Sequence, residues 1–295
     1  MSSSADHGLT AIVAAMPEEV APLRARLAGT RRLPVPGSAG AAEIFGGYLD
    51  GVSVALAVTG DGARNARQGI AALLGHVEVK RLIALGVAGA LSRDLTEGAL
   101  VVGEQVMLEG GGPDTVLRAD EVLVESATRA TGARRGVVMT AERIADTAAE
   151  KRRLLELVVA RSANAPLPGG RAGDTCAVVD LESAGYIGAA AQAGIPWVVL
   201  RAVSDTANEE LPALLNRSRD EGGAVRRGSV VRGLLGDPGL LPALLGLRRR
   251  VQMGAGVLSR AIAALLAVSE RGSSSSKNGS GGQPLRSSSR QGGMT

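Results

Sequence analysis

The chain has 295 residues, of which 45% are hydrophobic and 21% are charged, and this balance predicts a globular body with a sizeable core. The formal net charge of +4 becomes nearly neutral without Lys277, Arg286 and Arg290 of an acid-free terminal stretch, and aromatic residues are scarce, so no nucleic-acid-binding surface is expected. A single cysteine, Cys176, and two histidines argue against a disulfide framework, a histidine-rich metal site and a serine–histidine–aspartate triad.

Apolar runs typical of strands alternate with helical patterns from residue 9 onwards. A hairpin over residues 42–58 is expected to turn at Asp50–Gly51, a dipeptide that suits a tight two-residue turn. Further strands are expected at residues 9–15, 81–87, 99–108, 136–139, 176–180 and 197–203. Helices are expected at residues 17–27, 65–74, 120–131, 147–163 and 182–193. This alternation predicts a single-domain, three-layer α/β sandwich with a mixed, largely parallel central sheet.

Two loose ends flank the predicted domain, which covers residues 9–271. Residues 1–8 are expected to be a flexible leader without the pattern of a signal peptide, and residues 272–295 a disordered Gly/Ser-rich tail. The longest uncharged run, Ser183–Leu200, contains three glycines, a glutamine and a proline, which is not typical of a membrane span. We therefore expect a cytoplasmic protein without a transmembrane segment.

A C-terminal extension at residues 227–268 is apolar and studded with arginine, and it predicts two helices broken at Asp237–Pro238. Such helices suit a peripheral membrane contact or the wall of an apolar channel. The alternative is that they pack on the body or form an oligomer interface, and we prefer this second interpretation.

Candidate functional residues fall where predicted strands end, because ligands of such sheets bind beyond the carboxyl ends of the strands. Glu19 follows the first strand in "MPEEV", and Glu182 and Asp205 each follow a later apolar run. A carboxylate beside buried strands carries a desolvation cost that folding alone does not require, which suggests chemistry. The alternatives are that Glu19 and Glu182 are first-turn acids favoured by the helix dipole, and that Asp205 caps a loop.

Two glycine-containing turns are candidates for holding a phosphate or a nucleophile. "TGDGARNA" places Gly60, Gly62 and Arg64 at the start of a helix, and "VAGAL" contributes Val87 and Gly89. The first turn is similar to a phosphate-cradling loop, yet it lacks the Lys and Ser/Thr of a P-loop and the spacing of a dinucleotide fingerprint. Glycine-rich turns at strand ends are usually only turns.

Taken together and in order, these segments resemble the nucleoside phosphorylase superfamily, and most closely its methylthioadenosine/S-adenosylhomocysteine nucleosidases. The resemblance extends from about Thr10 to Leu211, and its most specific part is "VVDLESAGY" followed by "VVLRAVSDTAN". It implies an α/β sandwich that forms a homodimer or a larger homo-oligomer. It also implies an enzyme that breaks the N-glycosidic bond of a small-molecule nucleoside with water or phosphate, without a metal or another cofactor.

The resemblance implies catalytic roles for two of the acids. Asp205 is expected to protonate N7 of the purine and to contact the exocyclic amine, which favours adenine over 6-oxopurines. Glu19 matches the residue that orients and activates water in the hydrolytic branch.

Substrate-binding and supporting roles follow in the same way. Glu182 is expected to accept hydrogen bonds from the ribose 2′- and 3′-hydroxyls, and Leu181 replaces a methionine that underlies the sugar. Arg201 and Ser204 lie in the second motif, where the resemblance implies support for the carboxylates.

The chain also departs from the family pattern. Val87 stands where the family has a serine, and no aromatic residue that could stack on the base occurs in "TAERIAD", where Ile144 is the nearest apolar side chain. The nucleophile stays open, since Glu19 favours water whereas Arg64 and Arg67 could serve phosphate as a co-substrate.

Three hypotheses about the substrate remain. The extension and the "SD…LP" sequence of Ser204–Pro212 resemble the hopanoid-associated phosphorylases, which implies adenosylhopane or another adenosine with a bulky, lipid-linked 5′ substituent. The second hypothesis is a methylthioadenosine/S-adenosylhomocysteine nucleosidase with a small apolar 5′ pocket. The third is a non-catalytic nucleoside-binding relative.

Overall fold

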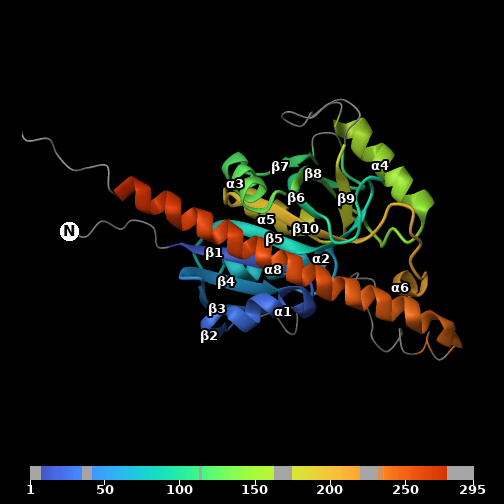
Figure 1. Ribbon diagram of the computed structural model, residues 1–295, viewed down its shortest axis with the longest axis horizontal. Coiled ribbons are helices and arrows are strands. Elements are labelled where there is room, and N and C mark those ends of the chain that lie inside the picture. The colour runs from blue at the N-terminus through green and yellow to red at the C-terminus, as the bar shows by residue number, and fades with distance from the viewer. Residues whose placement is uncertain are drawn as a thin grey trace, which may run out of the picture.

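The computed structural model describes residues 8–34, 42–112, 115–162, 175–219, 232, 234 and 236–277, with side chains up to residue 268. In these residues a central mixed sheet carries helices on both faces (Figure 1). The strands are β1 (Leu9–Ala14), β2 (Ala28–Leu33), β3 (Glu43–Leu49), β4 (Val52–Val58), β5 (Val79–Ala90), β6 (Leu100–Leu108), β7 (Leu117–Arg118), β8 (Arg134–Thr140), β9 (Ala177–Asp180) and β10 (Trp197–Asp205).

The sheet follows the order β10-β6-β8-β9-β5-β1-β4-β3-β2, with β7 added beside β6. Strand β5 pairs in parallel with both β1 and β10, and its last residues pair with β9. The strands β5, β10, β6, β8 and β9 therefore close into a ring, while β1, β4, β3 and β2 extend from it as an open sheet. The predicted hairpin is present, and Leu49 pairs with Val52 across its turn.

The helices form the two outer layers of the predicted sandwich. They are α1 (Pro17–Arg26), α2 (Ala63–Leu74), α3 (Glu121–Thr131), α4 (Ala148–Ser162), α5 (Ser183–Gln192), α6 (Leu214–Arg217), a 3₁₀ turn η2 (Pro238–Leu240) and α8 (Leu241–Lys277). Helices α1, α3 and α8 share one apolar core with the sheet, whereas α2 and α5 pack on the other face. Helix α4 covers β8 and β9. The fold is thus the predicted three-layer α/β architecture.

Helix α8 differs from the predicted pair of helices, because η2 at Pro238 is followed by one continuous helix (Figure 1). Leu258, Ile262 and Leu266 recur at helical spacing and are fully buried against the sheet, so this part of the helix belongs to the outer helical layer of the domain. The helix continues to Lys277, past the predicted start of the tail at Gly272. Residues 1–7 of the predicted leader, residues 227–231, 233 and 235 of the predicted extension, and residues 278–295 of the predicted tail lie outside the described residues.

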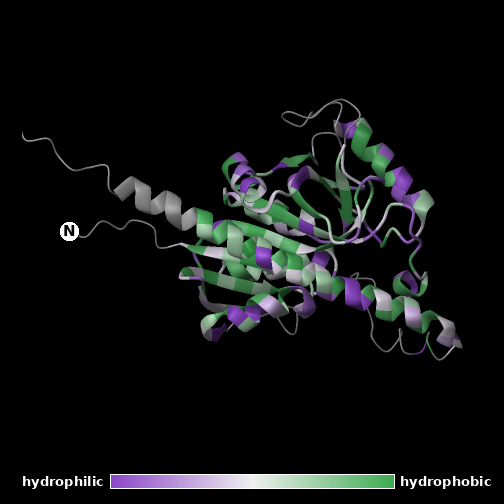
Figure 2. Cartoon of the chain, in the orientation of Figure 1, coloured by the Kyte–Doolittle hydropathy of each residue, from purple (hydrophilic) through white to green (hydrophobic). Residues whose placement is uncertain are grey.

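The hydropathy of α8 changes along its length (Figure 2). By length and composition, the segment Pro238–Val268 could cross a membrane, and it is the single helix of this kind among the described residues. Its buried leucine and isoleucine side chains are packed as in a core helix of a globular protein. Its first turns instead expose Leu241, Leu245 and Met253.

Candidate active site

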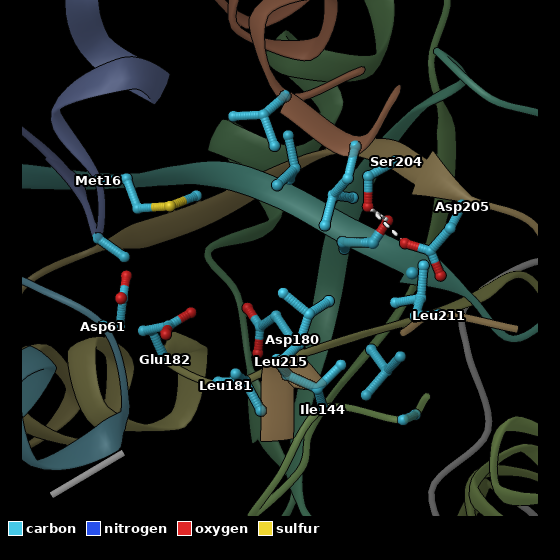
Figure 3. Close-up of a pocket in the computed structure, with 18 of the residues that line it drawn as sticks. Met16, Asp61, Ile144, Asp180, Leu181, Glu182, Ser204, Asp205, Leu211 and Leu215 are labelled. Atoms are coloured by element: carbon cyan, nitrogen blue, oxygen red, sulfur yellow. Dashed lines mark hydrogen bonds between the residues drawn. The ribbon is translucent and has the colours of Figure 1, made fainter. Parts of the chain in front are cut away.

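A cavity of about 240 Å³ lies where β1, β5, β9 and β10 end. Ser204 and Asp205 lie on one side of it, and Asp61 and Glu182 lie on the opposite side (Figure 3). Glu19 also borders the cavity. The structure thus brings the three predicted acids, which are far apart in the sequence, to one cavity.

Asp205 is the last residue of β10 and is held through both carboxylate oxygens. Ser204 Oγ donates a hydrogen bond of 2.6 Å to Oδ1, and Lys151 Nζ lies 2.5 Å from Oδ2. The Asp205 side chain is only 4% exposed and that of Lys151 only 1%. A Cβ at Gly89 would lie 2.8 Å from Asp205 Oδ2, so the absence of a side chain there makes room for the carboxylate. These contacts show a fixed buried acid rather than a loop cap.

Glu19 connects the first helix to the central strand. Its Oε2 accepts a hydrogen bond of 2.9 Å from Met16 N in a capping box, and its Oε1 accepts one of 2.9 Å from Val87 N on β5. Burial raises the pKa of Glu19, although these two amide bonds and the charge of Arg201 act in the opposite direction. Glu19 therefore does stabilise the helix start, as the alternative interpretation held, and it also borders the cavity.

Glu182 precedes α5 without capping it. Its Oε1 accepts a hydrogen bond of 2.7 Å from Gly62 N, and its side chain makes no capping bond to its own helix. Burial, and next the charge of Asp180, raise the pKa of Glu182 to about 8. A helix-end acid with only a dipole role would not be turned towards a distant loop, so the helix-dipole alternative does not account for this residue.

Asp180 and Arg201 form a buried ion pair behind Glu182. Arg201 Nε donates to Asp180 Oδ2 at 2.7 Å, and Arg201 Nη2 donates to Ser183 Oγ at 2.8 Å. Thr140 Oγ1 donates to the other carboxylate oxygen at 2.9 Å. Arg201 is 2% exposed and does not line the cavity, so it supports the site through Asp180.

The two glycine-containing turns do not form the phosphate cradle considered from the sequence. The amide of Gly62 is bonded to Glu182, and the side chains of Arg64 and Arg67 are exposed on α2 and do not line the cavity. Gly60 donates its amide to Ala15 O. Asp61, between the two glycines, borders the cavity and adds a carboxylate to this side. Val87 and Gly89 do line the cavity, as expected for the second turn.

The remaining walls are apolar. Leu181 borders the cavity as predicted, and Ile144 lines it at the place where an aromatic residue was lacking. The Asn216 side chain holds Ile144 by accepting from its amide at 3.0 Å and donating to its carbonyl at 2.8 Å. Further apolar side chains come from the segment around α6 and from α8: Leu211, Leu215, Leu247 and Val251.

Sequence reasoning missed Lys151 as a site residue and gave no separate role to Asp180 or Asp61. Lys151 lies in the charged run "EKRR" of α4, 54 positions before Asp205, and nothing in its spacing distinguishes it from a solvated lysine. Asp180 was visible only as part of the motif "VVDLES". In the described part of the chain, no group of three or more His, Cys, Asp or Glu side chains could hold a metal ion.

Comparison with known proteins agrees with this arrangement. The model of the phosphorylase superfamily matches residues 10–235. The chain is 33% identical over 215 residues to the 5′-methylthioadenosine/S-adenosylhomocysteine nucleosidase of Geobacillus kaustophilus (strain HTA426), an alignment that covers 68% of this chain and 85% of that protein. The corresponding protein of Geobacillus thermodenitrificans (strain NG80-2) is 32% identical with the same coverage.

Solved structures share the fold at lower identity. The 5′-methylthioadenosine/S-adenosylhomocysteine nucleosidase of Neisseria meningitidis, in complex with methylthio-immucillin-A, matches with a TM-score of 0.65 at 19% identity, over 88% of this chain and 99% of that one. The futalosine hydrolase of Helicobacter pylori strain 26695 matches with a TM-score of 0.63 at 17% identity, over 88% and 98%.

The fold and the cavity of buried carboxylates define an enzyme of the N-glycosyl hydrolase and phosphorylase class, as predicted. The chain belongs to the phosphorylase superfamily.

Proposed function

We propose that this protein is a nucleosidase that uses water to release adenine from a 5′-substituted adenosine. The observation that carries the proposal is the placement of Asp205 across one cavity from Glu182 and Asp61, with Glu19 also at its border (Figure 3). The curated relatives with about a third of their residues identical are named for nucleosidases of this kind, which supports the same reaction here.

The chemistry needs acids on two sides of the bond that breaks. As the N-glycosidic bond lengthens, positive charge develops on the sugar and negative charge on the departing base. Asp205 delivers a proton to the base, which is worth roughly 10²–10⁴-fold in rate. The carboxyl groups of Asp61, Asp180 and Glu182 border the same side of the reaction, and those that are ionised stabilise the developing sugar cation by their fixed charge. Glu19 takes the proton of the attacking water.

Water rather than phosphate suits the electrostatics of this cavity. A phosphate dianion would meet the carboxyl groups of Glu19, Asp61 and Glu182 where it needs cations, and the Gly62 amide that could bind one is bonded to Glu182. Among the described residues that line the cavity, the one cation is Arg219, which follows α6 in the chain. These observations support hydrolysis.

The apolar wall supports an apolar group at the 5′ position of the ribose. Leu211, Leu215, Leu247 and Val251 offer a surface that favours a methylthio or alkyl substituent over a charged one. A second candidate is a much bulkier lipid substituent such as a hopane, since α8 continues from this wall into the exposed Leu241 and Leu245. Assembly as a homodimer and a cytoplasmic location remain predictions.

Adenine release from a panel of adenosines tests the proposal. The panel holds adenosine itself and its 5′-methylthio, S-homocysteinyl and long-chain alkylthio derivatives, each assayed with and without phosphate. We expect adenine and free ribose derivatives, at a rate that phosphate does not change. Ribose 1-phosphate products would contradict hydrolysis, and the absence of adenine from every substrate would contradict the proposed function.

A further inference from the structure

Lys151 is a buried cation that contacts Asp205 without itself lining the cavity. It lies on the first turns of α4 and is 0% exposed, which is rare for lysine because burial of an ammonium group is costly unless it is paired. Its Nζ lies 2.5 Å from Asp205 Oδ2, 2.8 Å from Thr206 O and 3.0 Å from Glu209 O. Three acceptors therefore meet the three hydrogens of the ammonium group.

Asp205 is the acid that neutralises this lysine. The other charged side chains around the pair are engaged elsewhere: Glu209 binds Arg250 of α8, Glu150 binds Arg143, and Asp146 accepts from Asn216. The acids of the opposite wall, Glu182 and Asp61, face Asp205 across the cavity (Figure 3). Lys151 and Asp205 thus form a direct ion pair that is shielded from water.

We propose that Lys151 acts through Asp205, by supplying it with the proton that the departing base needs. This inference rests on the proposed function. A leaving adenine needs a proton, and the ammonium group of Lys151 is a proton donor in direct contact with Asp205. The short contact between Nζ and Oδ2 provides the source.

The proton balance closes over one turnover. A proton moves from Lys151 Nζ to Asp205 Oδ2, and the Asp205 carboxyl group passes a proton to the base as the N-glycosidic bond breaks and its electron pair stays on the base. Asp205 is then a carboxylate again, and Lys151 is a neutral amine. Water adds to the sugar carbon and loses its proton to Glu19, and solvent returns that proton to Lys151 after product release.

The surroundings of Nζ fit both protonation states. The neutral amine retains two hydrogens, which match the carbonyls of Thr206 and Glu209, and its lone pair then faces Asp205. No contact has to be rebuilt when the proton moves, so little reorganisation opposes the transfer. An arginine could not act in this way, because a guanidinium group does not release its proton in proteins.

Two substitutions separate proton supply from simple positioning. In Lys151→Met the carboxyl group has lost its cation and can bind a proton of its own, so we expect adenine release to fall roughly 10²-fold at pH 8 and to recover towards wild type at pH 5. In Lys151→Arg the positive charge stays but the guanidinium group does not release its proton, so the loss should persist at both pH values. Arg152→Met, at an exposed position of the same helix, is the matched control.

A second substrate tests the same point. A p-nitrophenyl riboside has a leaving group that needs no proton, so both Lys151 variants should cleave it within about threefold of wild type. Equal losses on both substrates at every pH would mean that Lys151 only holds the structure, and would overturn the inference. Unchanged adenine release by both variants would overturn it as well.

Wild-type enzyme gives an independent measurement if the variants do not fold. The ratio of kcat/KM for 5′-methylthioadenosine to kcat/KM for the p-nitrophenyl riboside removes pH effects that both substrates share. We expect this ratio to stay level from pH 5 to above pH 8. A tenfold fall of this ratio between pH 5 and pH 7 would show a lone carboxyl acid and overturn the inference. A wild-type enzyme that releases no adenine would instead refute the proposed function, and this inference with it.

Discussion

Replacing Gly89 by alanine tests whether the position of Asp205 limits the reaction. The new Cβ would lie 2.8 Å from Asp205 Oδ2 and 3.3 Å from Val179 Cγ1, the first of these well inside ordinary van der Waals contact. Asp205 cannot turn away without giving up its bonds to Lys151 and Ser204. We expect a displacement of roughly 0.5–1 Å, which lowers kcat/KM by about 10- to 100-fold, and a loss of about 1–3 kcal/mol in stability from overpacking.

The assay is adenine release, combined with thermal unfolding of the same preparations. Gly188→Ala is the matched control, because a Cβ at that position of α5 meets no atom within 4 Å. Its activity should not change, and its stability should rise by about 0.5–1 kcal/mol since alanine is the better helix former. Wild-type activity in the Gly89→Ala protein would refute the argument that the close approach of β5 positions the acid.

Three other expectations follow from the same structure. Asp205→Asn should fold but lose at least about 100-fold in kcat, measured by adenine release, because an amide cannot supply the proton; near-wild-type turnover would remove Asp205 from the mechanism. Because the pKa of Glu182 is raised to about 8 in the folded protein, its contribution to stability is complete below the unfolded value near 4.5 and is lost as pH rises towards 8. Glu182→Gln should therefore reduce the fall in unfolding free energy between pH 5 and pH 8 by about 1–2 kcal/mol, measured by urea titration, where the figure allows for screening by water in the cavity. The same dependence of unfolding free energy on pH in wild type and variant would contradict the burial argument. Deletion of residues 237–271 should abolish folding, seen by circular dichroism, because Leu258 and Ile262 belong to the core; a folded, active truncation would contradict that packing.

The sequence predicted most of the elements, because their residues show local patterns. The continuous apolar runs of β1 and β10 are typical of strands buried on both faces, and Asp50–Gly51 marks the hairpin. Strand β2 was missed because its residues, "AGTRRL", are almost all exposed and show no apolar alternation. The closure of β5 onto β10 depends on pairings between residues more than a hundred positions apart, which no local pattern reveals.

The candidate site divides in the same way. Glu19, Glu182 and Asp205 could be predicted because each acid follows an apolar run and their order matches a known family. Whether Arg64 faces the cavity or solvent depends on the orientation of α2, and the structure turns it outward. The role of α8 depended on packing as well, since an apolar helix with arginines suits both a core and a membrane surface.

Strand β5 also has a stereochemical consequence. Val87 holds Glu19 through its amide, and Gly89, two residues further along, faces Asp205. Two residues of a strand span roughly 6–7 Å, so β5 holds the acid assigned to the base and the acid assigned to water at separate points along one strand. With the proton donor on the side of the base, water is left to reach the sugar carbon from the opposite face. A β-nucleoside should therefore yield its sugar first as the α anomer, and the anomeric proton signal of freshly formed product would show which face the strand leaves open.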